Sequence, residues 1–161
     1  MFETERCSIN PFQKSDCSDV KKLYANQEVR KFLGGIRPEE STNLVLEEML
    51  DPNQNSFYWI IREKQTRNFI GLVSLAPHHE DIYQEISYQF SPCFWGKGYA
   101  IEVVSLIISF ALYELNLSTV VAETQTANKS SCRLLERLGM KLERIIFRFG
   151  AEQAIYSIKS S

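Results

Sequence analysis

The stretch FWGKGYA, from Phe94 to Ala100, holds the residues whose types and spacing point most directly to chemistry. Two glycines flank a lysine between a run that alternates like a strand and a long apolar run typical of a helix. Such a junction presents several backbone N–H groups in one direction, and Gly96 and Gly98 allow positive φ angles that let a ligand approach the main chain. Because Lys97 adds a mobile charge, the loop predicts a site for a phosphate or pyrophosphate.

Two better-known phosphate motifs do not fit this loop. A P-loop requires G-x-x-x-x-G-K-[ST], and a dinucleotide fingerprint requires a third glycine where this chain has Ile101. Taken alone, the stretch fits an ordinary strand-to-helix turn as well as it fits ligand binding. The elements around the loop therefore have to decide between the two interpretations.

The N-terminal third is expected to supply one strand and two helices. Weak alternation predicts a strand over about residues 4–9. A helix is predicted to begin near Ser15 and to continue, with apolar residues at helical spacing, up to Gly34. A second helix is expected after Pro38, over residues 39–50.

The middle of the chain changes to a period of two and then to a helical period. Runs rich in β-branched and aromatic residues over 56–63, 68–77 and 82–90 predict three antiparallel strands joined by short turns. Downstream of the loop, the apolar run predicts a helix that is largely buried against a sheet, because its polar residues form a single stripe. That stripe consists of Glu102, Ser105, Ser109 and Tyr113.

The C-terminal third is expected to add a strand, a helix and a final pair of strands. The strand is predicted over 118–124, and the helix over 128–139 with Asn128 as its N-cap. Strands over 141–149 and 153–159 complete the pattern. The order β-α-α-β-β-β-α-β-α-β-β predicts an α+β fold, with a central, mostly antiparallel sheet of about seven strands and about four helices.

Composition limits the classes of function. The 161 residues, 44% hydrophobic and 24% charged, predict one globular domain over 1–161. Eighteen basic and 20 acidic residues give a formal charge of -2, so no overall field favours nucleic acid or an anionic membrane. The four cysteines form no C-x-x-C pair, and only His78 and His79, expected to be exposed in a turn, could complete a metal site. We therefore expect no metal, reduced thiols and, without a signal pattern, a cytoplasmic location.

Several segments of the chain, and the order in which they follow one another, resemble the GNAT N-acetyltransferase superfamily. The resemblance is to the branch with the ribosomal-protein N-terminal acetyltransferases in particular. The segments WGKGYAIEVV and NKSSCRLLERLGMKLE look like its acetyl-CoA site, and the resemblance covers nearly the whole chain. It implies that the amides from Trp95 to Ala100 hold the pyrophosphate, and that the strand ending at Phe90 splays from its neighbour to admit the pantetheine arm. In the superfamily pattern [QR]-x-x-G-x-[GA], Trp95 replaces the usual glutamine or arginine. The cofactor-binding residues implied are Phe90, Ser91, Trp95, Gly96, Lys97, Gly98, Tyr99, Ala100, Asn128 and Ser131.

The resemblance also implies catalytic roles. Asn128 would lie near the pantetheine arm and Ser131 near the sulfur, as in the N-x-x-S segment of this branch. Attack of an amine on a thioester creates an oxyanion and expels a thiolate, so a positioned N–H and a proton donor both lower the barrier. We expect the main-chain amide after the splayed strand to serve the oxyanion. Glu85, which matches a glutamate of this branch, is the candidate base, acting through water, and Ser131 is the candidate acid.

The expected acceptor is a primary amine, attacked directly in a ternary complex. An α-amino group with a pKa near 8 needs less help than a lysine side chain near about 10.4, so a protein N-terminus suits a weak base. A polyamine, an amino acid or an aminoglycoside is the alternative acceptor, and a non-catalytic acetyl-CoA sensor is the alternative function. The oligomeric state is left open between monomer and homodimer.

Each candidate residue also has a simpler interpretation. Asn128 is a helix N-cap whether or not it meets a ligand. Ser131 fits an ordinary first-turn residue, and Glu85 fits a solvent-facing strand residue. Lys129 and Arg133 could pair with coenzyme A phosphates, although solvated helix charges are the default interpretation.

Overall fold

A single eight-stranded sheet forms the framework of the protein, in the order β1-β2-β3-β4-β5-β6-β8-β7. The computed structural model describes residues 1–80 and 82–161. Neighbouring strands are antiparallel except β5 and β6, which are parallel. The strands are β1 (Phe2–Glu3), β2 (Cys7–Pro11), β3 (Phe57–Glu63), β4 (Phe69–Pro77), β5 (Gln84–Phe90), β6 (Thr119–Gln125), β7 (Lys141–Arg148) and β8 (Ala151–Lys159).

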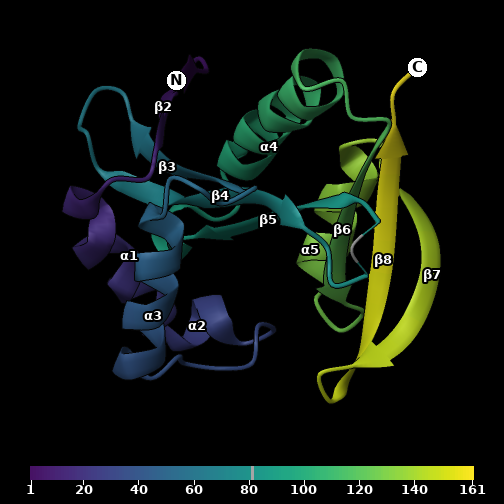
Figure 1. Cartoon of the computed structure of the whole chain (residues 1–161), viewed down its shortest axis with the longest axis horizontal. Helices are drawn as coiled ribbons and strands as arrows, with labels where there is room; N and C mark the ends of the chain where they lie inside the picture. Colours follow the sequence, from purple (N-terminus) through teal and green to yellow (C-terminus); the bar gives the residue numbers. More distant parts are fainter. Residues whose placement is uncertain (81) are drawn as a thin grey trace.

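Helices cover the sheet on both faces (Figure 1). The first three lie on one face of β3–β5 and α4 lies on the other, while α5 packs beside β6. In the described residues, no helix is long and apolar enough to cross a membrane. The α-helices are α1 (Cys17–Tyr24), α2 (Gln27–Arg30), α3 (Glu39–Leu50), α4 (Tyr99–Ser109) and α5 (Lys129–Arg137), with 3-10 turns at Lys14–Asp16 and Pro92–Phe94 and a π-helical turn at Phe110–Glu114.

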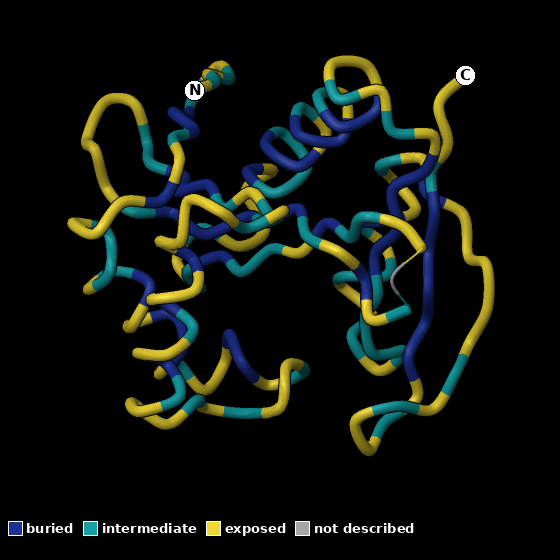
Figure 2. Tube along the Cα trace, in the orientation of Figure 1, coloured by how far each residue is buried: buried dark blue, intermediate teal, exposed yellow. Residues whose placement is uncertain are grey.

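Two hydrophobic clusters follow from this layering. The larger one joins the sheet to α4 and α5, and the smaller one joins it to α1–α3. Side chains that alternate along a strand divide between the two clusters, as Leu72 and Val73 of β4 do. Figure 2 shows the consequence, with the inner side of α4 and most of β6 and β8 buried.

The predicted order of strands and helices is confirmed, with three corrections to the boundaries. The first strand is β2, and it pairs with the short β1 instead of spanning 4–9. The expected long helix from Ser15 breaks after Tyr24, because the side chain of Asn26 accepts a hydrogen bond from the amide of Val29 and starts α2. The apolar helix after the loop changes from α to π geometry after Ser109.

The sheet forks between β5 and β6. Strand β5 pairs with β4 along its whole length, from Gln84 to Phe90. With β6 it shares only two pairs, Gln84 with Val120 and Glu85 with Val121. Beyond Glu85 the two strands diverge, so the predicted splay of the strand that ends at Phe90 is confirmed.

Candidate active site

The loop between β5 and α4 presents unpaired backbone amides to solvent. Gly96 and Gly98 have φ angles of 71° and 83°, as their predicted role requires. The amide of Trp95 donates to the carbonyl of Pro92, and the first amide used by the helix is that of Glu102, which donates to Gly98. In the part of the chain that the structure describes, the amides between them have no protein acceptor. These six amides at a helix start, from Gly96 to Ile101, form a cradle suited to an anion.

Trp95 stands at the position where the superfamily pattern has glutamine or arginine, and its side chain makes a different contact. Its indole Nε1 donates to the carbonyl of Phe90 at 2.8 Å, which ties the loop to the end of β5. Trp95 nevertheless remains 45% exposed. Because the tryptophan side chain is rigid and has only two side-chain torsions, this hydrogen bond holds the loop against the strand. The departure from the family pattern therefore leaves the loop well anchored.

The β1–β2 hairpin fixes the first turn of α4 from outside. Glu102 accepts from the Thr4 hydroxyl at 2.5 Å and from the Arg6 Nε at 2.8 Å. The guanidinium of Arg6 lies 3.9 Å from the centre of the Tyr99 ring, whose hydroxyl donates to Glu63 at 2.8 Å. An arginine stacked and paired in this way is held in one orientation. Glu102, the first residue of the polar stripe of the helix, thus anchors the loop.

The main-chain groups that face the fork come from alternate residues of β5. The amide of Ser91 donates to the carbonyl of Ile70 at 2.8 Å, on the β4 side. Because successive residues of a strand point their N–H groups to opposite sides, the amides of Tyr88 and Phe90 face the fork. The expectation that the amide after the strand serves an oxyanion is wrong, since Ser91 is already bonded. Tyr88 and Phe90 supply the amides that can do so.

A hydrogen bond crosses the fork between β5 and α5. The hydroxyls of Tyr88 and Ser131 lie 2.7 Å apart, and the amide of Ser131 donates to the Asn128 side chain at 3.2 Å. Asn128 is therefore the predicted N-cap, and it positions the turn that carries Ser131. Burial raises the pKa of Tyr88 to about 12, so its phenol stays protonated at neutral pH. Sequence analysis missed Tyr88, although its alternation with Ile86 and Phe90 places it on this face.

Glu85 lies at the base of the fork, on the opposite face of β5 from Tyr88. The carboxyl group is partly buried, and burial raises its pKa to about 7, with the nearby Glu123 carboxylate adding to the rise. The expected solvent-facing alternative is therefore wrong in part. A carboxyl with a pKa near neutrality is divided between a proton acceptor and a proton donor at physiological pH. The candidate base and the candidate acid approach the fork from different sides of the sheet.

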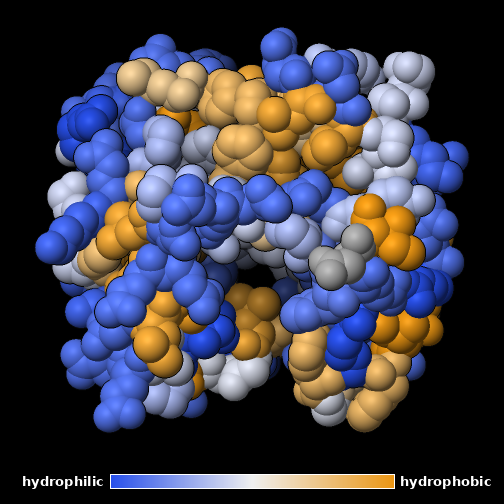
Figure 3. Space-filling model, viewed as in Figure 1, coloured by the Kyte–Doolittle hydropathy of each residue, from blue (hydrophilic) through white to orange (hydrophobic). Residues whose placement is uncertain are grey.

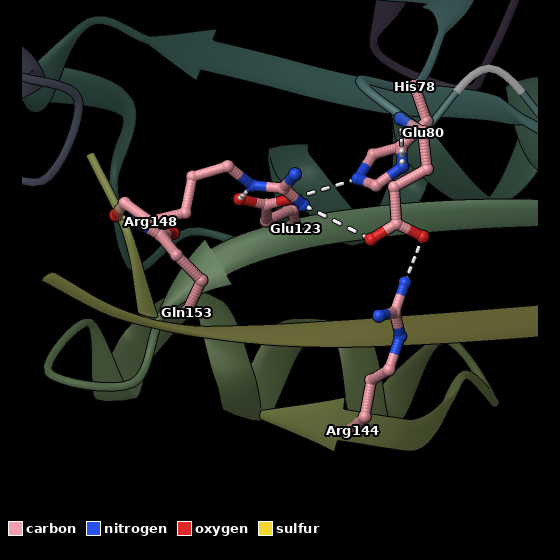
Figure 4. A network of polar contacts seen from close by, with 6 residues as sticks. All are labelled: His78, Glu80, Glu123, Arg144, Arg148 and Gln153. Carbon is pink, nitrogen blue, oxygen red and sulfur yellow. Dashed lines mark hydrogen bonds and ion pairs between the residues drawn. The ribbon is translucent and has the colours of Figure 1, made fainter. Parts of the chain in front are cut away.

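A buried ionic network surrounds the base of the fork (Figure 4). His78 is only 4% exposed, contrary to the expected exposed turn, because its Nε2 lies 2.7 Å from an oxygen of Glu123. Arg148 of β7 donates to both oxygens of the same carboxylate, at 2.8 and 3.2 Å. Burial acts to raise the pKa of Glu123, but the hydrogen bonds from Arg148 and His78 outweigh it and lower the pKa. In residues 1–80 and 82–161, no group of three or more potential ligands could hold a metal ion.

Comparison with known proteins shows the family to which this chain belongs. The family model for the acetyltransferase (GNAT) domain matches residues 6–141. The chain belongs to the GNAT acetyltransferase family. Its fold and the named relatives make it an N-acetyltransferase of the GNAT type.

Relatives and solved structures agree with this assignment. A Bacillus subtilis protein named as the uncharacterized N-acetyltransferase YoaA is 27% identical over 157 residues, covering 92% of this chain and 87% of its own length. A GNAT acetyltransferase from Bacillus anthracis superposes with a TM-score of 0.83 at 24% identity, covering 98% of this chain and 96% of its own. A spermidine N-acetyltransferase from Vibrio cholerae, solved with CoA and spermine, gives a TM-score of 0.82 at 17% identity and covers 96% of both chains.

Within this GNAT chain, the predicted site residues fall into three groups. Trp95 to Gly98 form the loop, and Tyr99 and Ala100 begin α4. Phe90 ends β5 and Ser91 follows it, while Asn128 caps α5 and Ser131 lies in its first turn across the fork. Glu85 lies outside these groups, on the face of β5 opposite the one that carries Tyr88 and contacts Ser131. Residues that sequence reasoning missed, Tyr88 and the Glu123 network, owe their positions to contacts with partners more than 20 residues away.

Proposed function

We propose that the protein transfers an acetyl group from acetyl-CoA to a primary amine, with the N-terminal amine of a protein as the leading acceptor. The observation that carries the proposal is the fork between β5 and β6, which has the amide loop at one end and the Tyr88–Ser131 pair across it. With the pyrophosphate bound on the loop, the fork would remain free to hold the extended pantetheine arm. Direct transfer in a ternary complex needs no nucleophile from the protein.

The residues expected to hold the coenzyme fit such a ligand. A Cβ built on Gly96 would meet no atom within 4 Å, so the main chain is open to close approach there. The amides from Gly96 to Ala100 and the Lys97 ammonium would bind the pyrophosphate. Phe90, Ser91 and Asn128 would line the arm. The thioester that coenzyme A supplies activates the acetyl carbonyl, and the amides of Tyr88 or Phe90 would hold its oxygen.

Glu85 is proposed as the acceptor of the amine proton. Its pKa of about 7 lies about one unit below that of an α-amino group, so transfer through one water costs little. The pKa of this carboxyl would match the pKa of a lysine side chain, about 10.4, much less well. The proposal therefore favours an N-terminal amine or another amine of low pKa.

Ser131 and Tyr88 are proposed to stabilise the departing thiolate. The pKa of Tyr88, about 12, lies well above the roughly 8.5 of an ordinary thiol, so full proton transfer from the phenol would be unfavourable. The phenol instead donates to the Ser131 oxygen and leaves the Ser131 hydroxyl proton free to face the sulfur. Hydrogen bonds to a developing charge lower the barrier without completing the transfer.

Two alternatives remain testable against this proposal. The similar fold of spermidine N-acetyltransferases supports a polyamine, or another small amine, as acceptor. A non-catalytic acetyl-CoA sensor, the second alternative, would present the same loop as an enzyme of the ribosomal-protein branch. The free state of all four cysteines fits the proposed cytoplasmic location.

The test is thiol release from acetyl-CoA with a panel of N-terminal peptides, free lysine, spermidine and an aminoglycoside. We expect peptides to be acetylated and Gly98→Trp to abolish both turnover and coenzyme binding, because the indole would fill the cradle. Acetyl-CoA binding by calorimetry without turnover of any amine would support the sensor. Absence of acetyl-CoA binding would overturn the proposal.

A further inference from the structure

Arg30 is a buried arginine with no carboxylate partner among residues 1–80 and 82–161. It is 7% exposed, yet its guanidinium bonds only to neutral oxygens, those of Gly35 at 3.0 Å, Leu33 at 2.6 Å and the Gln89 side chain at 3.4 Å. Arg62, which is more exposed, pairs with two aspartates. Burying a cation without a counter-ion is costly, so the arrangement calls for an anion.

A second arginine shares the position. Arg30 and Arg37 lie 5.5 and 5.6 Å from the centre of the Tyr24 ring, and within the described residues neither makes an ion pair. The Nε of Arg37 is buried without any hydrogen-bond partner. Burial lowers the pKa of Arg30, and the charge of Arg37 lowers it further. Two guanidinium groups on one ring, with a donor unused, are the elements of an anion site.

The pair lies on the side of the sheet that faces Glu85. Gln89, which accepts from Arg30, is two positions past Ser87 and four past Glu85, so the side chains of Gln89 and Glu85 share a face of β5. Its partner across the sheet is Leu72, in the cluster under α1–α3. Tyr88, Ser131 and the proposed coenzyme arm lie on the other face. The arginines therefore border the side left for the acceptor.

The surface is open at this position. Figure 3 shows the face hollowed between the helical half and the β6–β8 half of the molecule. A hollow of about 480 Å³ is lined by Gln27, Glu28, Lys31 and Gly35, and the carbonyl of Gly35 accepts a hydrogen bond from Arg30. The charges of Glu28 and Lys31, which line this hollow, offset each other.

We propose that Arg30 and Arg37 bind a carboxylate of the acceptor, so that the substrate is an amine that carries an anionic group at a distance. This inference rests on the proposed function and narrows its acceptor. Gln89 lies four positions beyond Glu85, roughly 13 Å along the strand. An acceptor of roughly 10 Å, such as a tripeptide with a free C-terminal carboxylate, would reach from the base to the arginines. A polyamine would place a cation beside them.

The test compares matched acids and amides. The tripeptide Ser-Ala-Ala and its C-terminal amide, and 8-aminooctanoate, its amide and 1,8-diaminooctane, would be assayed by thiol release. We expect kcat/KM at least about tenfold higher for each acid than for its amide, the value of a hydrogen-bonded charge pair. Arg37→Met should remove that ratio and leave the KM for acetyl-CoA unchanged, and Arg37→Lys should restore part of it.

Arg137→Met, at an exposed position in α5, is the matched control and should keep the wild-type ratio. Arg37 is preferred over Arg30 for the test because Arg30 also holds the 31–37 loop. Equal kcat/KM for acids and amides, or a ratio that Arg37→Met leaves unchanged, would overturn the inference. If no amine is acetylated, the proposed function fails separately, and calorimetry of the tripeptide acid and amide with CoA-loaded protein still decides. Equal affinities there would overturn the carboxylate site.

Discussion

Tyr88 and Glu85 lie on one strand, three residues apart, and their side chains reach opposite faces of the sheet. This separation lets the two sides of one reaction be handled independently. In the proposed reaction, the hydroxyl pair of Tyr88 and Ser131 would meet the leaving group, and Glu85 would meet the incoming amine. Environment rather than residue type sets both pKa values, because burial raises the pKa of each group.

Glu85→Gln tests the proposed base through pH. The pKa of about 7 means that the wild-type rate should rise with pH through 7, as the carboxylate form accumulates. The variant should lose about tenfold or more in kcat at pH 7.5 and lose this inflection. Glu47→Gln, exposed on α3, is the control. An unchanged pH–rate profile in Glu85→Gln would exclude the role.

The same carboxyl gives a stability signature. Its folded pKa lies above the ordinary 4.5, so between these values the folded protein keeps a proton that the unfolded chain has released. The stabilising contribution is complete below pH 4.5 and is lost as pH rises through 7. Urea unfolding of Glu85→Gln should accordingly show a flatter decline from pH 5 to 8 than the wild type.

Tyr88→Phe and Ser131→Ala should each lower kcat by about tenfold, and the double variant should be little worse than either, since they act as one unit. Affinity for acetyl-CoA should stay within about twofold, because the cradle amides are untouched. Tyr113 and Ser161 form an exposed hydroxyl pair at 3.2 Å, so Tyr113→Phe is a matched control. Additive losses, or losses confined to KM, would contradict the relay.

At the scale of elements, the β5–α4 loop links a strained backbone to ligand binding. Gly98 and Gly150 have φ angles of 83° and 74°. An alanine at either position should cost about 1–2 kcal/mol of stability, because an L side chain strains the left-handed region. Only Gly98→Ala should also weaken acetyl-CoA binding, since Gly150 lies in the β7–β8 turn. Thermal unfolding and calorimetry of both variants separate strain from binding, and equal affinities would contradict the cradle.

Elements with a clear period were predictable, and those set by long-range contacts were not. The meander β3–β5 and the buried helix α4 follow from alternation and from a single polar stripe. The break at Asn26 was missed because one cap outweighed a helical spacing that continues beyond it. Position 78 was misread as exposed, since its partner, Glu123, is 45 residues away. The loop residues were predictable because their backbone geometry is local.

At the scale of the whole molecule, the fork divides the sheet into two halves that share one short junction. Strands β1–β5 form one half and β6–β8 the other, joined by two residue pairs. The network of His78, Glu123 and Arg148 reinforces that junction from three strands or their ends. The divergence of β5 and β6 leaves few backbone hydrogen bonds between the halves. Buried ion pairs at the base compensate for that loss in holding the halves at a fixed angle.

Glu123→Gln should therefore destabilise the whole domain and not only its site. The carboxylate is 5% exposed, and its removal leaves Arg148 with only the longer ion pair to Glu80, at 3.6 Å, and His78 without its carboxylate partner. We expect this to cost about 3 kcal/mol and to lower Tm by roughly 6–12 °C. Because its pKa is lowered in the folded state, its contribution is present above the ordinary 4.5 and is lost as pH falls through the folded value. The wild type should lose stability below pH 4.5, and the variant should lose less. Glu152→Gln, at an exposed site whose carboxylate accepts from the Thr126 hydroxyl, should match the wild type throughout. Equal unfolding free energies of the two variants at pH 7 would show that the network does not hold the fork.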